Sequence, residues 1–478
     1  MVFNSLEFLF FFVSVFVVHL LLGQRYKWLF LLTASYFFYA QTKPVYLLLL
    51  AGCTLVTYFC ALLISSLKEN VKRKVVLFIG IGINIGALVL FKYEDFIIGL
   101  LNQYLFTSIS ISPLPLMNWI LPVGISFYVF QSLSYLIDVY RKDIETEKHL
   151  GYFALYVSFF PQLVAGPIER PDNLIPQLKQ KHVFDPLKFR SGIQLALWGF
   201  FKKMVIADNL GVFVNDVFGN VQEQNSIVLI VATVFFGIQI YCDFSGYTDI
   251  AIGLARTMGF EFRKNFDAPY FASSLSEFWR KWHMSLSTWF KDYLYFPLGG
   301  GKKGKVRTYV NLFVVFIVSG LWHGAAINYV IWGGIHGLVI CLEKFILQFR
   351  KQPSALWMKV GGWMITFTIV MIAWVFFRLP SFHEAILVVQ KMFSFEISDF
   401  HLKLLHQHGL AKTEFNLSLV FSLLVFGFDL LKRSGIEIIG TLGKLTLLRW
   451  LYYFIILFVI LIYGNYGEVQ QQFIYFQF

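Results

Sequence analysis

The 478-residue sequence contains few charged residues. Only 14% of it is Asp, Glu, Lys or Arg, and 57% is hydrophobic, whereas soluble domains carry about 25% charged residues. Apolar runs close to the roughly 20 residues that cross a bilayer recur from one end to the other. This composition excludes an ordinary soluble domain and predicts an all-α polytopic membrane protein.

Cysteine is equally scarce, and its placement excludes two kinds of site. Cys53, Cys60, Cys242 and Cys341 all lie in apolar runs without metal-ligand spacing, so we expect buried thiols, no disulfide framework and no metal. The sequence also lacks a Gly-x-Ser-x-Gly elbow, a Walker A loop and a His-Glu-x-x-His helix. The formal net charge of +12 falls mostly in short loops, which the positive-inside rule explains better than nucleic-acid binding.

Thirteen apolar segments are candidate spans, of which we expect eleven to thirteen to be transmembrane or re-entrant helices. The first has no basic n-region and no small-residue cleavage site, so we expect a retained helix and not a signal peptide. The basic loop at 68–74 and the mixed, hydrophilic loop at 141–148 are placed on the cytoplasmic side, which predicts an N-terminus outside. The segments are 5–22, 28–40, 45–66, 75–91, 119–140, 150–165, 191–207, 227–242, 309–322, 326–347, 360–378, 415–431 and 449–464.

The chain is interpreted as one membrane domain, with N-terminal helices (1–118), a core (119–347) and C-terminal helices (348–478). Residues 263–307 carry nine basic and three acidic residues, so their net charge of +6 is half of the whole excess. Tryptophans are interleaved with these charges. Basic, Trp-rich amphipathic helices lie in the headgroup plane on the cytoplasmic side. We therefore expect His283 on, or just under, that surface.

Two groups of polar residues interrupt apolar segments. Asp243 and Asp249 lie six residues apart, about 240° around a helix, so they do not form an acid pair. Their segment is either the polar lining of a cavity or a helix end with an Asp or Ser cap. His323 lies between Trp322 and Gly324, and a buried imidazole there stays neutral, as a general base requires. His323 is accordingly either a catalytic base or a packing histidine; His283 and His336 have similar surroundings.

Taken in order, the motifs of the chain resemble the membrane-bound O-acyltransferase family, specifically the bacterial branch that includes the membrane subunit of alginate O-acetylation. The resemblance covers most of the chain. It rests on LPVGISF (121–127), GPIERP (166–171), DFSGYTDIA (243–251), NFDAPY (265–270), EFWRKWH (277–283), LGG (298–300), GLWHG (320–324) and the closing FIYFQF (473–478).

The resemblance implies a ring of membrane helices around a central tunnel. An acyl thioester, acetyl-CoA or an acyl carrier, arrives from the cytoplasm as a substrate, with no bound cofactor. His323 matches the family's main catalytic histidine. His283 matches a second position, which orients the donor or stabilises the oxyanion. Further candidates for tunnel lining and donor contact are Asp243, Ser245, Tyr247, Asp249, Trp279, Arg280 and Trp322.

The function that this resemblance implies is O-acetylation of an extracytoplasmic polysaccharide, with a hydrolase-like extracytoplasmic acetyltransferase as partner. One alternative is transfer of D-alanine or another acyl group toward teichoic acid or another envelope polymer. A second alternative, from a different class, is a polytopic transporter without chemistry. The transporter accounts for the apolar spans and the buried aspartates, but it does not account for paired histidines in these contexts.

Overall fold

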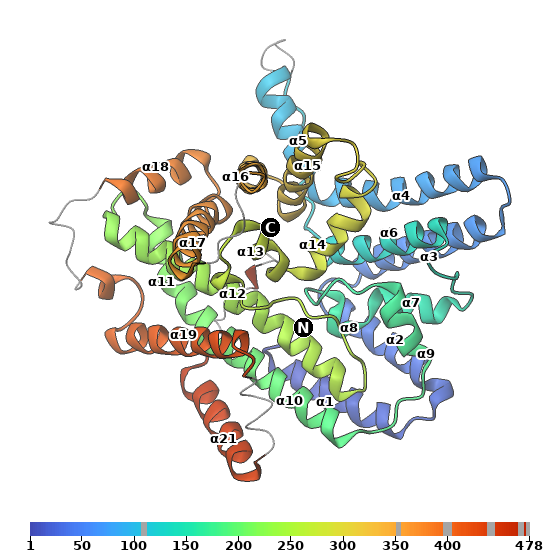
Figure 1. Ribbon diagram of the computed structural model, residues 1–478. Coiled ribbons are helices and arrows are strands. Elements are labelled where there is room, and N and C mark those ends of the chain that lie inside the picture. The colour runs from blue at the N-terminus through green and yellow to red at the C-terminus, as the bar shows by residue number, and fades with distance from the viewer. Residues whose placement is uncertain (107–111, 350–354, 395–403, 437–444, 467–472, 475–478) are drawn as a thin grey trace. The chain divides into compact units, whose positions relative to one another are not determined.

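The computed structural model describes residues 1–106, 112–349, 355–394, 404–436, 445–466 and 473–474 (Figure 1). The described residues form helices joined by turns and irregular segments and contain no strand, so the all-α prediction is confirmed. They divide into two units: Met1–Gly192 with Leu254–Arg263, and Ile193–Gly253 with Lys264–Phe478. The division of the chain into N-terminal, core and C-terminal parts stays a prediction.

In its described residues the first unit contains nine α-helices, α1 to α9, and one π-helical turn. Within it α3, α4 and α6 lie side by side (Figure 1). Gly124 precedes α6 with φ of 76°, and a Cβ there would lie 2.5 Å from the Leu163 carbonyl oxygen, so only glycine fits this turn. The elements are α1 (Leu6–Leu21), α2 (Gln24–Ala40), α3 (Tyr46–Ser66), α4 (Asn70–Lys92), α5 (Glu94–Leu100), η1 (Leu101–Phe106), α6 (Ile125–Arg141), α7 (Leu150–Ser158), α8 (Phe160–Leu163) and α9 (Pro171–Lys179).

The second unit carries both predicted catalytic histidines. Two of its helices, α10 (Pro186–Phe200) and α12 (Ser226–Thr257), begin or end in the first unit. The others are η2 (Phe201–Ala207), α11 (Asp208–Gly219), η3 (Pro269–Phe271), α13 (Leu275–Lys281), α14 (Met284–Phe290), η4 (Lys291–Tyr295), α15 (Lys305–His323), α16 (Ile327–Ile346), α17 (Leu356–Arg378), α18 (Phe382–Phe393), η6 (Leu404–Gln407), α19 (Lys412–Arg433) and α21 (Thr446–Tyr463).

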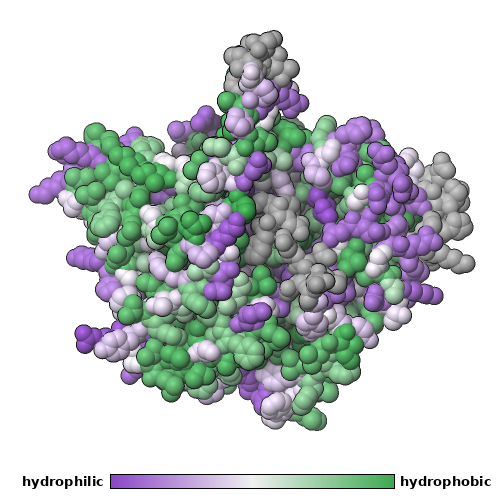
Figure 2. All heavy atoms as spheres, turned by 180° about the vertical axis from the view of Figure 1, so that it is seen from behind, coloured by the Kyte–Doolittle hydropathy of each residue, from purple (hydrophilic) through white to green (hydrophobic). Residues whose placement is uncertain are grey.

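Eight described helices are long and apolar enough to cross a bilayer: α3, α4, α12, α15, α16, α17, α19 and α21. Their outer faces expose large apolar side chains, and Figure 2 shows hydrophobic atoms over much of the face seen there. Such a surface is suited to lipid. The remaining candidate spans are shorter helices of at most 17 residues, and two of them are interrupted, at Phe159 and where α10 passes into η2. The chain is a multi-pass membrane protein.

Two glycines allow close packing of α15 against α16. A Cβ on Gly320 would lie 2.1 Å from the Tyr329 carbonyl oxygen, and one on Gly333 would lie 2.3 Å from that of Phe316. Small residues at a helix interface let two backbones approach in this way. The close packing brings the end of α15, with His323, beside the aromatic face of α16.

Candidate active site

His323 is the last residue of α15 and is enclosed by aromatic rings. Its imidazole is buried, and it makes edge contacts at centroid distances of 5.0 Å to Trp322, 5.0 Å to Trp332 and 5.3 Å to Phe377. The helix ends at Gly324, where the Tyr329 ring packs so closely that an added Cβ would lie 2.0 Å from it. An imidazole among aromatic rings is held in a low-dielectric environment, where proton transfer is sensitive to geometry.

His283 is completely buried and sits in an unusual backbone conformation. It precedes α14 with φ of 44° and ψ of 55°, a left-handed conformation that costs a non-glycine residue about 1–2 kcal/mol. The Phe244 ring meets the imidazole edge-on at 4.6 Å. Burial lowers the pKa of His283 to about 3, so its imidazole is neutral at physiological pH. The His283 imidazole is therefore enclosed by protein side chains, and its position relative to the membrane surface stays a prediction.

Asn265 holds the turn in which His283 lies. Its side-chain oxygen is 3.1 Å from the Ser285 backbone nitrogen, 2.9 Å from Ser285 Oγ and 3.2 Å from His283 Nδ1. Its backbone oxygen accepts a hydrogen bond of 2.9 Å from the Met284 N–H. We did not predict Asn265 as a site residue, although it opens the NFDAPY motif. The missing information was that it would meet a histidine 18 residues further on.

Trp322 joins the two predicted catalytic histidines. Its ring lies 6.0 Å from the His283 ring and 5.0 Å from the His323 ring, measured between centroids. Three residues predicted from the sequence are therefore brought together where α14 begins and α15 ends. The shared aromatic wall fixes the two imidazoles relative to each other.

Trp279 of α13 and Trp332 of α16 form a second aromatic group, which contacts His336 and, through Trp332, His323. The Trp279 indole N–H donates to His336 Nδ1 at 3.3 Å, and the Trp332 ring lies 4.8 Å from His336 and 5.0 Å from His323. Trp279 is thus buried within the histidine cluster, whereas its neighbour Arg280 is exposed. The two adjacent residues face different environments.

The polar residues of α12 are held in a network of ion pairs. The helix is continuous from Ser226 to Thr257, so a helix end between 243 and 249 is excluded. Lys203 Nζ lies 2.6 Å from Asp243 and 2.7 Å from Asp208, both carboxylates being buried. Lys202 Nζ lies 2.8 Å from Ser245 Oγ and 2.7 Å from Asp249. We missed these lysines, although two cations within the apolar segment 191–207 were a signal.

Both lysines belong to the π-helical turn η2, and they pair with different positions of α12, Lys203 with Asp243 and Lys202 with Asp249. A π-turn adds a residue to the helical repeat and often marks a functional position. Asp243 also accepts a hydrogen bond of 2.7 Å from the Ile474 N–H, and the Phe473 ring lies 4.7 Å from the Tyr247 ring, tilted by 31°. These two residues belong to the closing motif, whose other residues, 475–478, lie outside the described part of the chain.

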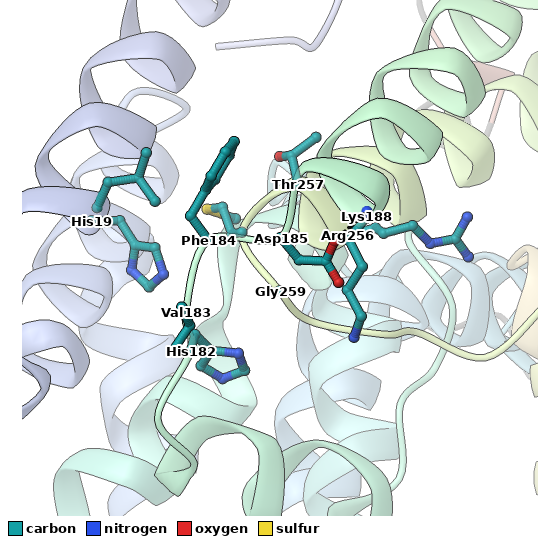
Figure 3. A pocket seen from close by; sticks show the side chains of 11 residues that line it. His19, His182, Val183, Phe184, Asp185, Lys188, Arg256, Thr257 and Gly259 are labelled. Atoms are coloured by element: carbon teal, nitrogen blue, oxygen red, sulfur yellow. Dashed lines mark hydrogen bonds between the residues drawn. The ribbon is translucent and has the colours of Figure 1, made fainter. Parts of the chain in front are cut away.

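A separate hollow of about 260 Å³, including its open mouth, lies in the first unit (Figure 3). His182, Lys188 and Arg256 line it with His19, whose ring in Figure 3 lies across from that of His182. Its cations already have partners, since both Lys188 and Arg256 pair with Glu261, at 3.7 and 3.0 Å. We assign this hollow no part in the chemistry.

Comparison of the sequence with known proteins identifies relatives that match most of this chain. Residues 89–382 match the model of the membrane-bound O-acyltransferase family. A probable alginate O-acetylase of Pseudomonas putida is 42% identical over 83% of this chain and 81% of its own length. A peptidoglycan O-acetyltransferase of Helicobacter pylori is 35% identical over 76% and 73%. A teichoic acid D-alanyltransferase of Bacillus subtilis is more distant, at 26% identity over 56% and 71%.

Proposed function

The chain belongs to the membrane-bound O-acyltransferase family, and we propose that it O-acetylates an extracytoplasmic polysaccharide. The similarity to an alginate O-acetylase and to a peptidoglycan O-acetyltransferase supports acetyl as the transferred group and an envelope polymer as the final acceptor. The acetyl donor in this proposal is a cytoplasmic thioester, acetyl-CoA or an acetylated carrier. The protein itself holds no cofactor and lies in a bacterial inner membrane with its N-terminus outside.

The observation that carries the proposed mechanism is the pair of buried histidines on one tryptophan, His283 and His323 on either side of Trp322. His323 accepts the proton of an acceptor hydroxyl while the hydroxyl oxygen attacks the thioester carbonyl. A carbon–oxygen bond forms, and the carbon–sulfur bond breaks as the tetrahedral intermediate collapses. The proton on His323 then passes to the departing sulfur, which leaves the enzyme in its starting state.

The other predicted residues divide into two groups in this proposal. Trp279 and Trp322 form the walls that exclude water around the imidazoles. Arg280, exposed beside them, is suited to a negatively charged part of the donor. Asp243, Ser245 and Asp249 are bonded to lysines, so we assign them to holding α12 against η2, and Tyr247 to the same surface.

A partner completes the proposed pathway. Transfer to a polysaccharide outside the membrane requires an acceptor that reaches the buried histidines, and we propose a hydrolase-like extracytoplasmic acetyltransferase for this step. D-Alanyl transfer toward teichoic acid is the second candidate, supported by the more distant D-alanyltransferase relative. Acetyl and D-alanyl thioesters supplied in parallel to the same membranes distinguish the two functions.

The test measures transfer of label from acetyl-CoA in membranes that contain the wild type, His323→Ala or His283→Ala at equal protein levels. We expect His323→Ala to lose about 100- to 10,000-fold in rate, as loss of a general base does, and His283→Ala to lose less. His19→Ala is the matched control, because His19 is a buried histidine of the first unit outside the proposed site. Full activity of His323→Ala would refute the assignment of the base.

A further inference from the structure

We infer that Asn265 is a positioning residue that fixes the tautomer of His283, so that His283 offers an acceptor nitrogen to the substrate. The inference rests on the proposed function, because it assigns the chemistry of one of its two histidines. It narrows the role of His283, for which both donor orientation and oxyanion stabilisation were predicted. The Asn265 atom that faces the imidazole, oxygen or nitrogen, decides the tautomer of His283.

The Ser285 backbone decides that orientation. A backbone N–H can only donate a hydrogen bond, and the Ser285 N–H meets the Asn265 side chain at 3.1 Å. The atom at this position must therefore be the amide oxygen. The same oxygen lies 3.2 Å from His283 Nδ1. Ser285 Oγ also faces Nδ1, at 3.5 Å, but it donates its proton to the same Asn265 oxygen at 2.9 Å. Because an oxygen accepts and does not donate here, Nδ1 carries the proton, and Nε2 carries the lone pair.

The surroundings keep the ring in this orientation. The backbone bond from the Met284 N–H to the Asn265 oxygen, 2.9 Å long, ties the chain on the far side of His283 to the same residue. Phe244 meets the imidazole at an interplanar angle of 85°. A ring flip would move Nδ1 away from its acceptor and bury a polar group without compensation, which is costly.

The tautomer determines what His283 can bind. A neutral imidazole with its proton on Nδ1 cannot donate from Nε2, so it cannot stabilise an oxyanion there, which requires hydrogen-bond donors. It can accept a hydrogen bond from a neutral donor group of a substrate, an O–H of the acceptor or an amide N–H of the thioester. His283 is thus an acceptor for a substrate donor group, held in that state by Asn265.

The experiment reads the tautomer directly from the nitrogen resonances of ring-labelled histidine in the purified full-length protein. His283→Ala identifies the His283 signals by their loss. We expect the wild type to show a protonated Nδ1 and a bare Nε2. In Asn265→Ala the pair of signals should change to a mixture of tautomers, whereas Asn265→Asp, which keeps an acceptor, should retain the proton on Nδ1.

Asn311→Ala is the matched control for loss of a buried asparagine. Asn311 is 1% exposed, as is Asn265, and it donates to the Gly300 carbonyl at 3.0 Å, so its removal should leave the His283 signals unchanged. Kinetics complete the test: Asn265→Ala should lower kcat about tenfold. A rise in KM for the acceptor indicates that His283 binds a hydroxyl, and a rise in KM for the thioester indicates an amide.

Two results would overturn the inference. One is a protonated Nε2 in the wild type, and the other is an unchanged tautomer in Asn265→Ala. Neither depends on activity, so the inference can fail while the proposed function holds. Conversely, full transfer by His323→Ala would refute the proposed function without altering the tautomer that the resonances report.

Discussion

Replacement of Gly333 by alanine tests whether the spacing of α15 and α16 sets the geometry of the active site. The added Cβ would lie 2.3 Å from the Phe316 carbonyl oxygen, whereas ordinary van der Waals contact begins at 3.4 Å. The neighbouring atom is backbone and cannot rotate away. The two helices must therefore separate by about 1 Å, and overpacking of this kind costs roughly 1–3 kcal/mol.

We expect Gly333→Ala to lower activity because the neighbouring residue, Trp332, contacts His323. Trp332 lies beside Gly333 in α16, and its ring is 5.0 Å from that of His323 in α15. A displacement of about 1 Å at a catalytic group can cost about 100-fold in rate. We therefore expect Gly333→Ala to lower kcat by about two orders of magnitude, with a smaller effect on KM.

Gly334 provides a matched control in the same turn of α16. A Cβ there would meet only the end of the Ile317 side chain, at 3.7 Å. Alanine is favoured over glycine in a helix by up to about 1 kcal/mol, so Gly334→Ala should be neutral or stabilising. Acetyl transfer and thermal unfolding are measured for both variants. Equal activity of Gly333→Ala and Gly334→Ala would refute the argument from helix spacing.

Two further predictions concern buried charges. Lys203→Met leaves the carboxylates of Asp208 and Asp243 without their shared cation. It should lower the free energy of unfolding by about 3–5 kcal/mol, measured as a loss of thermal stability. Lys203→Arg should retain most of the wild-type stability, and equal stability of the two variants would contradict this prediction. Burial raises the pKa of Glu169 to about 7 from 4.5, so the folded state binds a proton that the unfolded state has released. Stability should accordingly fall as pH rises from about 4.5 to about 7, and this slope should be weaker in Glu169→Gln; unfolding midpoints measured across that range test it.

Much of the fold and part of the site could be predicted from the sequence. Long apolar runs specify membrane helices because a backbone in lipid must satisfy its hydrogen bonds internally, and eight of the expected spans are helices long and apolar enough to cross a bilayer. The sequence motifs around His323 and His283 also predicted these two residues as candidate catalytic residues. Both are buried, and Trp322 lies against each of them.

The partners of these groups could not be predicted, because they are selected by packing between distant segments. Asp243 was expected either to line a cavity or to cap a helix end, and neither expectation indicated its partner Lys203 in the π-helical turn η2, 40 residues earlier in the sequence. The charged residues and tryptophans around His283 in the sequence predicted a position on, or just under, the membrane surface, but they did not indicate its contacts with Asn265 and Phe244. Its imidazole lies 3.2 Å from the Asn265 side-chain oxygen, in a left-handed backbone conformation that the sequence pattern did not predict.

The sequence by itself thus determined the class of protein, the helices that can cross the membrane and the residue types available for catalysis. The tertiary structure alone decided which of these residues touch, which carboxylates are neutralised by lysine and which nitrogen of His283 carries its proton. The physical reason is that hydrophobic length is a local property of the chain. Hydrogen-bond and ion-pair partners of buried groups depend instead on the close packing of helices far apart in sequence.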